Sequence, residues 1–456
     1  MPDGETPAPV RLAILSYSTG EFDARSFRVA RSAMAAGYAV TMYSRWAPGL
    51  PPREERAGYT LVRVHHSWQL GMPGMRAAAR KRLAREVAES ERRRVAGDVA
   101  AQAPAPAPAG GPVARPGLLR RVARRIARPI RRWTGAVQMF PLRPLGWADA
   151  LEAAAAPADL WHGMWAGSLP ALARLRARHG GHTVYDSRDV YLQSRELAHL
   201  GWPLRPILAG LERRWARRAD LVVTVNEPYA DLLAGQLRIP RPAVVLNCPD
   251  RWDPPAVPPD RLRRALGLPP STRVVLYQGQ LIRERGIEQA MDAVLALPDT
   301  ALCLLGYGTH EAAYRARAAG PPYAGRVFVL SAVPPEDLLD WTASADVVVM
   351  PIQPTTVNHR FTTPQKLWEA IGAGVPVVAS DLPGMAGIVR EAGVGALCDP
   401  ERPASIAEAI LGILDQTPEE RAELRRHVLR VAHERYTWEP QAATLLRLYA
   451  DLGARR

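Results

Sequence analysis

Short apolar runs alternate with helical patterns along most of the 456-residue chain. The first series begins with an apolar run at 10–18, continues with a helical stretch from Ala24 to Ala36 closed by Gly37, and adds two apolar runs at 38–45 and 60–67. After an interruption, apolar runs recur at 159–164, 182–187, 220–226 and 243–248, with helical patterns between them. Continuous apolar runs of this kind are typical of parallel strands buried on both faces. The pattern predicts an open α/β sheet in the first half of the chain.

A second series follows a proline-rich joint at 247–260. Its apolar runs lie at 273–280, 301–308, 326–333, 346–352 and 376–381, and three helical stretches end the chain. Because a single core stops growing near roughly 250 to 300 residues, a chain of this length predicts two domains. We expect an α/β architecture with two facing Rossmann-like, doubly wound domains and a cleft between them. We expect residues 1–246 to form the N-terminal domain, 247–260 the linker, 261–435 the C-terminal domain and 436–456 a helix packing back toward the N-terminal domain.

The formal net charge of +14 is concentrated in one segment. Residues 75–133 hold 16 arginines and lysines but only four acids, so the rest of the chain is close to neutral. This distribution argues against specific nucleic-acid binding, which also lacks a recognisable module and interleaved aromatic residues. We interpret about 70–140 as a basic low-complexity insertion into the first domain.

Residues 118–133 within this insertion place apolar side chains at i+4 spacing opposite arginines. Such a helix is typical of proteins that lie on anionic membranes. The alternative is a disordered arginine-rich insert. No apolar run is long enough to span a bilayer, so we expect a cytoplasmic protein, peripheral at the inner face of the cell membrane if residues 118–133 dock there.

Two groups of residues in the second half of the chain suggest a binding or catalytic site. In the first, an apolar run ends at Gly279, a short loop carries Arg283 and Arg285, and a helical pattern starts after Gly286. Unpaired N–H groups at a helix N-terminus, together with fixed positive charge, favour a phosphate or diphosphate. The alternative is a pair of solvated loop arginines.

In the second group, Pro364 fits a first helical turn, and Lys366 and Glu369 share one face at i, i+3 spacing. The lysine can neutralise a phosphate, and the carboxylate can accept hydrogen bonds from ribose hydroxyls. The alternative is an ordinary surface ion pair, worth only about a few tenths of a kcal/mol.

Taken with these residues, the run PQKLWEAIGAGVPVVASDLPG and the segments YQGQLIRERGIEQ, LLGYG, VYDSRD, ARRADLVVTVN and TWEPQAATLLRLY resemble the family-4 retaining glycosyltransferases of the GT-B fold, the glycosyl transferases group 1. The resemblance extends over nearly the whole chain except the insertion. It implies the GT-B architecture, with residues 1–246 as the acceptor-side domain and 261–435 as the nucleotide-sugar donor domain. It implies that Arg285 and Lys366 stabilise the donor phosphates, that Glu369 binds the ribose, and that the backbone at Tyr307, Gly308 and Val333 receives the base. Gly279, Gln280 and Arg283 complete the donor side.

The resemblance implies sugar transfer from a nucleotide-diphosphate sugar to a hydroxyl acceptor, lipid-linked or part of a cell-surface or secondary-metabolite glycan. It implies no metal and no cofactor beyond the sugar nucleotide as co-substrate. Candidate acceptor-side residues are Gly20, Asp23, Arg25, Asp186, Arg188 and Asp189. Asp23 equally fits a helix N-cap.

Three positions depart from the family's pattern. Phe361 stands where a glutamate is common, with Asn358 or His359 as its replacement; Gln280 replaces an arginine; and Arg188 replaces a histidine. A guanidinium cannot act as a base at neutral pH. These departures leave a second hypothesis open, a catalytically silent homologue that acts as a binding or scaffold subunit of a glycan biosynthesis complex.

Overall fold

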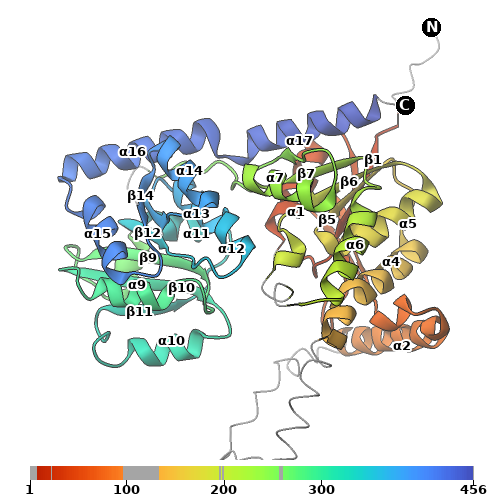
Figure 1. The fold of residues 1–456 in the computed structure, drawn as a ribbon, viewed down its shortest axis with the longest axis horizontal. Helices are drawn as coiled ribbons and strands as arrows, with labels where there is room; N and C mark the ends of the chain where they lie inside the picture. The colour runs from red at the N-terminus through yellow and green to blue at the C-terminus, as the bar shows by residue number, and fades with distance from the viewer. Residues whose placement is uncertain are drawn as a thin grey trace, which may run out of the picture. The chain divides into compact units, whose positions relative to one another are not determined.

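The computed structural model describes residues 8–21, 23–95, 133–194, 197, 200–255 and 260–454. The chain divides into two compact units. Unit 1 comprises 1–224, 230–243 and 446–456, and unit 2 comprises 225–229 and 244–445. Figure 1 shows the helices and strands of each unit: unit 1 holds the red to yellow-green elements together with the blue residues from 446 onward, and unit 2 holds most of the green to blue elements.

Unit 1 is built on an eight-stranded sheet with the strand order β3-β4-β2-β1-β5-β6-β7-β8. Strands β1, β2, β4, β5, β6 and β7 pair in parallel. The strands are β1 (Arg11–Ser16), β2 (Ala39–Arg45), β3 (Arg53–Arg56), β4 (Tyr59–Val64), β5 (Leu160–Met164), β6 (His182–Ser187), β7 (Leu221–Thr224) and β8 (Ala243–Val244). The α-helices of this half are α1 (Ala24–Ala35), α2 (Arg76–Val95), α4 (Arg143–Ala154), α5 (Leu169–His179), α6 (Leu204–Ala216) and α7 (Glu227–Leu237). Short helical turns are η1 (Trp68–Gly71), η2 (Pro73–Met75), η4 (Gln138–Leu142), η5 (Ala166–Ser168) and η6 (Tyr191–Gln193).

The sequence pattern did not predict strand β3. Its residues, REER, carry no apolar alternation, and β3 pairs antiparallel with β4 at the edge of the sheet. An edge strand exposes much of its surface, so charged side chains are tolerated there and even favoured. The strand forms because the chain turns back at Ala57 and Gly58, both with positive φ, and pairs with the apolar β4.

The region expected to be a low-complexity insertion contains ordered helices at both ends. Helix α2 packs Ala79 and Leu83 against Leu70, and Arg80 forms an ion pair with Asp149 of α4 at 2.8 Å. Both contacts fix α2 to the rest of unit 1. The predicted linker at 101–117 and the predicted amphipathic helix at 118–133 lie outside the described residues, apart from the helical Trp133, whose exposed fraction is 45%.

Unit 2 is built on a six-stranded sheet with the order β11-β10-β9-β12-β13-β14, and all of its strand pairs are parallel. The strands are β9 (Arg273–Gln280), β10 (Thr300–Tyr307), β11 (Val327–Ser331), β12 (Val347–Met350), β13 (Val377–Ser380) and β14 (Gly395–Cys398). The helices are α8 (Arg261–Leu266), α9 (Ile287–Val294), α10 (Glu311–Ala318), α11 (Leu338–Ala343), α12 (Val357–Phe361), α13 (Gln365–Gly372), α14 (Pro383–Ala392), α15 (Pro403–Leu414), α16 (Pro418–Arg435) and α17 (Trp438–Gly453).

Alternate residues of each strand in unit 2 enter two separate cores. In β9, Val274 and Leu276 join the core that contains Trp368 of α13, while Val275 and Tyr277 join the core that contains Met291 of α9. The sheet is therefore covered on both faces, which explains its continuous apolar strands. The three cysteines are free and buried.

The proline-rich joint at 247–260 differs from a free linker. Cys248 is buried in the core of unit 2, Trp252 packs against that core, and the carbonyl of Pro249 accepts a hydrogen bond from the Trp438 amide. At the other end of the chain, α17 contributes to both units, since residues from Leu446 onward belong to unit 1. The two mainly parallel sheets with their covering helices confirm the predicted fold class of two Rossmann-like units. Among the described residues, none of the helices has the length and apolar character required to cross a bilayer.

Gly286 lies where the end of β12 closely approaches the start of α9, and a substitution there tests this contact. A Cβ added there would lie 1.9 Å from the carbonyl oxygen of Pro351, and its φ is +70°. Gly286→Ala should therefore lower the free energy of unfolding by about 2 kcal/mol or more, measured by urea denaturation.

Gly412 provides the matched control. It is exposed inside α15 with nothing near its Cβ position, so Gly412→Ala should raise the free energy of unfolding by about 0.5–1 kcal/mol. Equal effects of the two substitutions would contradict this account of Gly286.

Candidate functional site

Lys366 lies at the carboxyl end of strand β9. Its ammonium nitrogen is 3.6 Å from the centroid of the Tyr277 ring, and a Cβ at Gly279 would be 3.7 Å from it. The nitrogen is buried and has no hydrogen-bond partner among the described residues. Burial, and then the charge of Arg285, lower the pKa of Lys366 well below its ordinary value, while Glu369 acts in the opposite direction. The aromatic face thus lies against an amine whose charged form a nearby anion would stabilise.

Glu369 is held by a relay of polar side chains. The amide nitrogen of Gln278 donates to its carboxylate at 2.7 Å, and the hydroxyl of Thr342 donates to the amide oxygen of Gln278 at 2.8 Å. Gln278 and Thr342 are both buried. Within the described residues, no ion pair links Glu369 to Lys366, so the two do not form the ordinary surface pair.

Arg285 stands immediately before Gly286, the N-cap of α9. No ion pair or hydrogen bond of its side chain is found in the described part of the chain, yet its charge acts on both Lys366 and Tyr277. Two predicted residues, Arg285 and Lys366, therefore bring positive charge to one place. Like charges at close range are costly unless an anion offsets them.

The remaining donor-side candidates lie along the same edge of the sheet. Gln280 ends β9 and is exposed, and its carbonyl accepts a hydrogen bond from the Tyr277 hydroxyl at 2.9 Å. Tyr307 ends β10 with an exposed fraction of 58%, and a Cβ at Gly308 would lie 2.4 Å from the Leu281 carbonyl oxygen. Arg283 is exposed in the loop, and Val333 packs against the core that contains Trp368.

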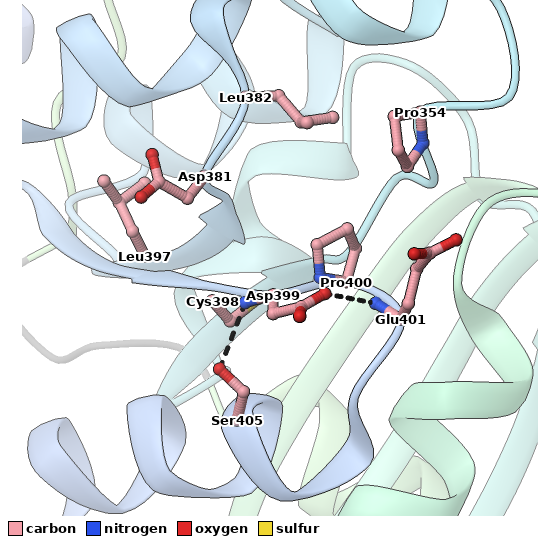
Figure 2. Close-up of a pocket in the computed structure, with 9 residues that line it drawn as sticks. All are labelled: Pro354, Asp381, Leu382, Leu397, Cys398, Asp399, Pro400, Glu401 and Ser405. Carbon is pink, nitrogen blue, oxygen red and sulfur yellow. Dashed lines mark hydrogen bonds between the residues drawn. The ribbon is translucent and has the colours of Figure 1, made fainter.

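A separate cavity of about 380 Å³ lies at the carboxyl ends of β13 and β14 (Figure 2). Its lining includes the carboxylates of Asp381, Asp399 and Glu401, and Arg390 pairs with Asp381 at 2.6 Å. None of the predicted donor-side residues lines it. A cavity with three carboxylates would repel a diphosphate, so we do not place the donor there.

Phe361 stands where the family commonly has a glutamate, and this segment is held by hydrogen bonds to its backbone carbonyl groups. The side chain of Asn226 donates to the Phe361 carbonyl at 2.9 Å, and Tyr229 donates to the Asn358 carbonyl at 3.1 Å. The ring of His359 contacts the Thr355 hydroxyl at 2.8 Å. Asn358 and His359 are both buried. That either side chain replaces the sugar contact of the family's glutamate stays a prediction.

In unit 1, Asp23 and Arg188 form an ion pair of 2.7 Å. Asp23 also caps α1 by accepting from the Ser26 amide, so the expected N-cap role is real as well. Burial would raise the pKa of Asp23, but the charge of Arg188 and hydrogen bonds from Ser16 and Ser26 outweigh it and lower the pKa to about 2. Arg188 keeps 27% of its side chain exposed and is therefore held in place by a buried carboxylate.

Arg25 and Asp186 form a second ion pair of 2.7 Å that is almost fully buried, with exposed fractions of 1% and 0%. His162 lies 3.4 Å from the Asp186 carboxylate and contacts the Tyr449 hydroxyl through its other ring nitrogen. This burial favours a structural role for Arg25 and Asp186.

The last two acceptor-side candidates lie in loops. Gly20 is buried with φ +74°, and Asp189 is exposed. In the described residues, no group of three or more histidine, cysteine, aspartate or glutamate side chains is arranged to hold a metal ion.

The relay that holds Glu369 was missed by sequence reasoning, although a glutamine inside the apolar run of β9 was a usable signal. Gln278→Leu removes a partner from Glu369 and from Thr342, so it should lower the free energy of unfolding by about 1–3 kcal/mol in urea denaturation. The exposed Gln365 is the control, and Gln365→Leu should change this free energy by no more than about 0.5 kcal/mol. Equal stability of the two variants would refute the relay.

The Asp23–Arg188 pair predicts a pH dependence. Because the folded pKa of Asp23 is lowered from 3.8 to about 2, its stabilisation is present above pH 3.8 and is lost as the pH falls toward 2. This corresponds to roughly 2 kcal/mol at 1.36 kcal/mol per pKa unit. In Arg188→Met the loss over this window should be smaller, measured by urea denaturation at a series of pH values. Arg178→Met, at an exposed position, should follow the wild type; parallel curves for all three proteins would disprove the assignment.

The match of this chain to a family model lies within unit 2. Residues 259–428 match the family described as glycosyl transferases group 1. The chain is 30% identical over 263 residues to the D-inositol 3-phosphate glycosyltransferase of Xylanimonas cellulosilytica, covering 54% of this chain and 60% of the relative. It is 27% identical over 230 residues to the 2-deoxystreptamine glucosyltransferase of Streptomyces kanamyceticus, covering 48% and 58%. The chain thus spans about half the length of the curated relatives it matches.

Solved structures extend the likeness of fold to nearly the whole chain. The sucrose-phosphate synthase of Thermosynechococcus elongatus has a TM-score of 0.68 at 19% identity, covering 98% of this chain and 100% of that one. The Anabaena HepE protein in complex with UDP and glucose has a TM-score of 0.60 at 15% identity, covering 97% and 100%. Residues 259–428 thus resemble the glycosyl transferases group 1 family, and the likeness to the solved structures shows that the chain carries the GT-B fold.

Proposed function

We propose that this chain transfers a sugar from a nucleotide-diphosphate sugar to a hydroxyl group of an acceptor, with retention of the anomeric configuration. The observation that carries the proposal is the pair of cations Lys366 and Arg285 at the carboxyl end of β9. The side-chain nitrogen of Lys366 is buried over Tyr277 without a hydrogen-bond partner among the described residues, and the pKa of Lys366 is lowered by burial and by Arg285. Such a site gains stability when a dianionic diphosphate binds.

The other donor contacts follow from the same edge of the sheet. Glu369, oriented by Gln278, accepts hydrogen bonds from the ribose hydroxyls. The exposed end of β10 at Tyr307 and Gly308, with Val333, receives the base. The complex of HepE with UDP and glucose makes UDP-glucose the first donor to test.

In the proposed reaction, the bond between the sugar's anomeric carbon and the diphosphate oxygen breaks, and negative charge develops on the leaving diphosphate. Lys366 and Arg285 stabilise that charge, which lowers the barrier. The acceptor hydroxyl attacks from the same face, and its proton passes to the departing phosphate oxygen. Neither a protein nucleophile nor a metal is part of the scheme, so activity should survive chelation by EDTA.

The Xylanimonas relative is named a D-inositol 3-phosphate glycosyltransferase. We infer that the acceptor of this chain is likewise a hydroxylated ring. Docking of residues 118–133 on an anionic membrane, which would suit a lipid-linked acceptor, stays a prediction from the sequence. Co-sedimentation with anionic vesicles, with and without residues 101–133, measures it.

Release of nucleoside diphosphate from UDP-, GDP-, ADP- and TDP-sugars tests the proposed function. One donor should be turned over, and Glu369→Gln and Lys366→Met should each lower kcat/KM by about a hundredfold or more. Arg264→Met, at an exposed position of α8, is the matched control and should keep the wild-type rate. Nuclear magnetic resonance of the product's anomeric proton should show the configuration of the donor.

Stability separates a binding role of Lys366 from a structural one. Because Lys366 is desolvated in the free protein, Lys366→Met should raise the urea midpoint while it lowers activity. A chain that neither binds nor turns over any donor would overturn the proposal and favour the scaffold subunit.

A further inference from the structure

The sheet of unit 1 has a switch point between β1 and β5. Strand β1 pairs with β2 on one side and with β5 on the other, and β2 pairs in turn with β4. All of these pairs are parallel, so the carboxyl ends of four neighbouring strands meet at one edge. In open α/β sheets, the crevice at such a switch point is where ligands bind. The residues that follow these strands are therefore candidates for ligand contact.

Two aromatic residues occupy this switch point. Tyr17 directly follows β1 and Trp165 directly follows β5; their rings are stacked with centroids 5.8 Å apart and an interplanar angle of 24°. Gly167 makes the arrangement possible, because a Cβ there would lie 2.6 Å from the Tyr17 ring. Trp165 has φ +69°, a conformation that is rare for a bulky residue and that is found mostly at functional sites.

Two arginines at the same edge have no carboxylate partner among the described residues. Arg45 ends β2, and its guanidinium carbon lies 4.7 Å from the centroid of the Tyr17 ring. Its Nε is buried and has no hydrogen-bond partner within the part of the chain that the structure describes. Among the same residues, neither Arg45 nor Arg143 forms an ion pair, whereas Arg25, Arg63 and Arg188 of this unit each pair with a carboxylate.

The two arginines impose a positive potential on their neighbours. The pKa of His66 is lowered to about 3, mainly by burial and then by the charges of Arg45, His65 and Arg143. Burial raises the pKa of Tyr17 to about 12, and both arginines oppose this shift. Among the described residues, no carboxylate is a cause of either shift. The cluster of Tyr17, Arg45, His66, Arg143 and Trp165, which we call the switch-point cluster, is thus a site of positive charge that no described carboxylate neutralises, next to a half-buried indole.

We propose that the switch-point cluster binds the anionic group, a phosphate or a carboxylate, of a sugar or polyol whose ring contacts Trp165. Arg45, held by the face of Tyr17, supplies a guanidinium suited to bidentate recognition of such an anion. The identification of this ligand as the acceptor of the transfer reaction rests on the proposed function. The binding of the anion itself does not depend on it.

Isothermal titration calorimetry of the full chain with glucose 6-phosphate, glucuronate, inorganic phosphate and glucose tests this site. Either glucose 6-phosphate or glucuronate should bind at least about tenfold more tightly than glucose, and the tighter of the two identifies the anion. Arg45→Met should weaken binding of that ligand by about tenfold or more, and Arg45→Lys should retain part of it. Arg178→Met, exposed on α5 of the same unit, removes the same charge elsewhere and should leave binding unchanged.

Three outcomes would overturn the assignment. They are equal binding of glucose and both anionic sugars, undiminished binding by Arg45→Met, and equal weakening by Arg178→Met. Thermal unfolding of Arg45→Met shows whether it is folded, and the measurement on Arg45→Lys decides the case if it is not. If the chain turns over no sugar nucleotide yet binds an anionic sugar through Arg45, the proposed function fails while the site stands. If it turns over a donor and Arg45→Met binds normally, the site fails alone.

Discussion

In both sheets, the parallel register of the strands brings their carboxyl ends to one edge, and every charged group with a proposed role depends on this constraint. In unit 2, β9 pairs with β10 on one side and β12 on the other, so Gly279, Tyr307 and Pro351 end up side by side although they are far apart in sequence. In unit 1, the same rule places Tyr17, Arg45 and Trp165 together. Because the strands themselves are buried and apolar, the fold confines its polar chemistry to these two edges.

The proposed site at β9 shows how a sheet can hold a cation that is poorly solvated. Tyr277 points into the core that contains Met291, and its ring supports the Lys366 ammonium, while the neighbouring Gln278 faces the other way and holds Glu369. Two consecutive residues of one strand therefore fix the two candidate site residues of α13 from opposite faces of the pleat. The desolvation of Lys366 costs stability in the free protein. A bound anion would offset this loss of stability, so the cost is compatible with selection for binding.

The sequence was informative about the units and the donor edge because both leave short-range patterns. Apolar runs identified the parallel strands, and the spacing of Lys366 and Glu369 after Pro364 placed them on one face of α13. Lys366 is also one of only two lysines in the chain, beside Lys81, among 59 basic residues. Other features needed tertiary structure. The edge strand β3 has no apolar pattern, the relay from Thr342 to Gln278 joins residues 64 positions apart, and Arg25 and Asp186, 161 positions apart, turned out to be buried with each other.

The arginines of unit 1 differ in whether a carboxylate pairs with them. This difference, and not charge alone, separates arginines with a structural role from arginines that can bind an anion. Arg25 is fully buried with Asp186, and removing it from water is offset only by that carboxylate and by the surrounding polar groups. Arg188 is anchored by Asp23 but keeps part of its surface open, so it can orient a neutral hydroxyl without much affinity for an anion. Arg45 has an aromatic ring where the others have a carboxylate, and its charge is not cancelled within the described residues. An anion gains little next to Arg25 or Arg188 because each charge is already neutralised. Next to Arg45 the same anion meets a guanidinium whose attraction is undiminished, which is why the binding site is assigned to the edge between β1 and β5.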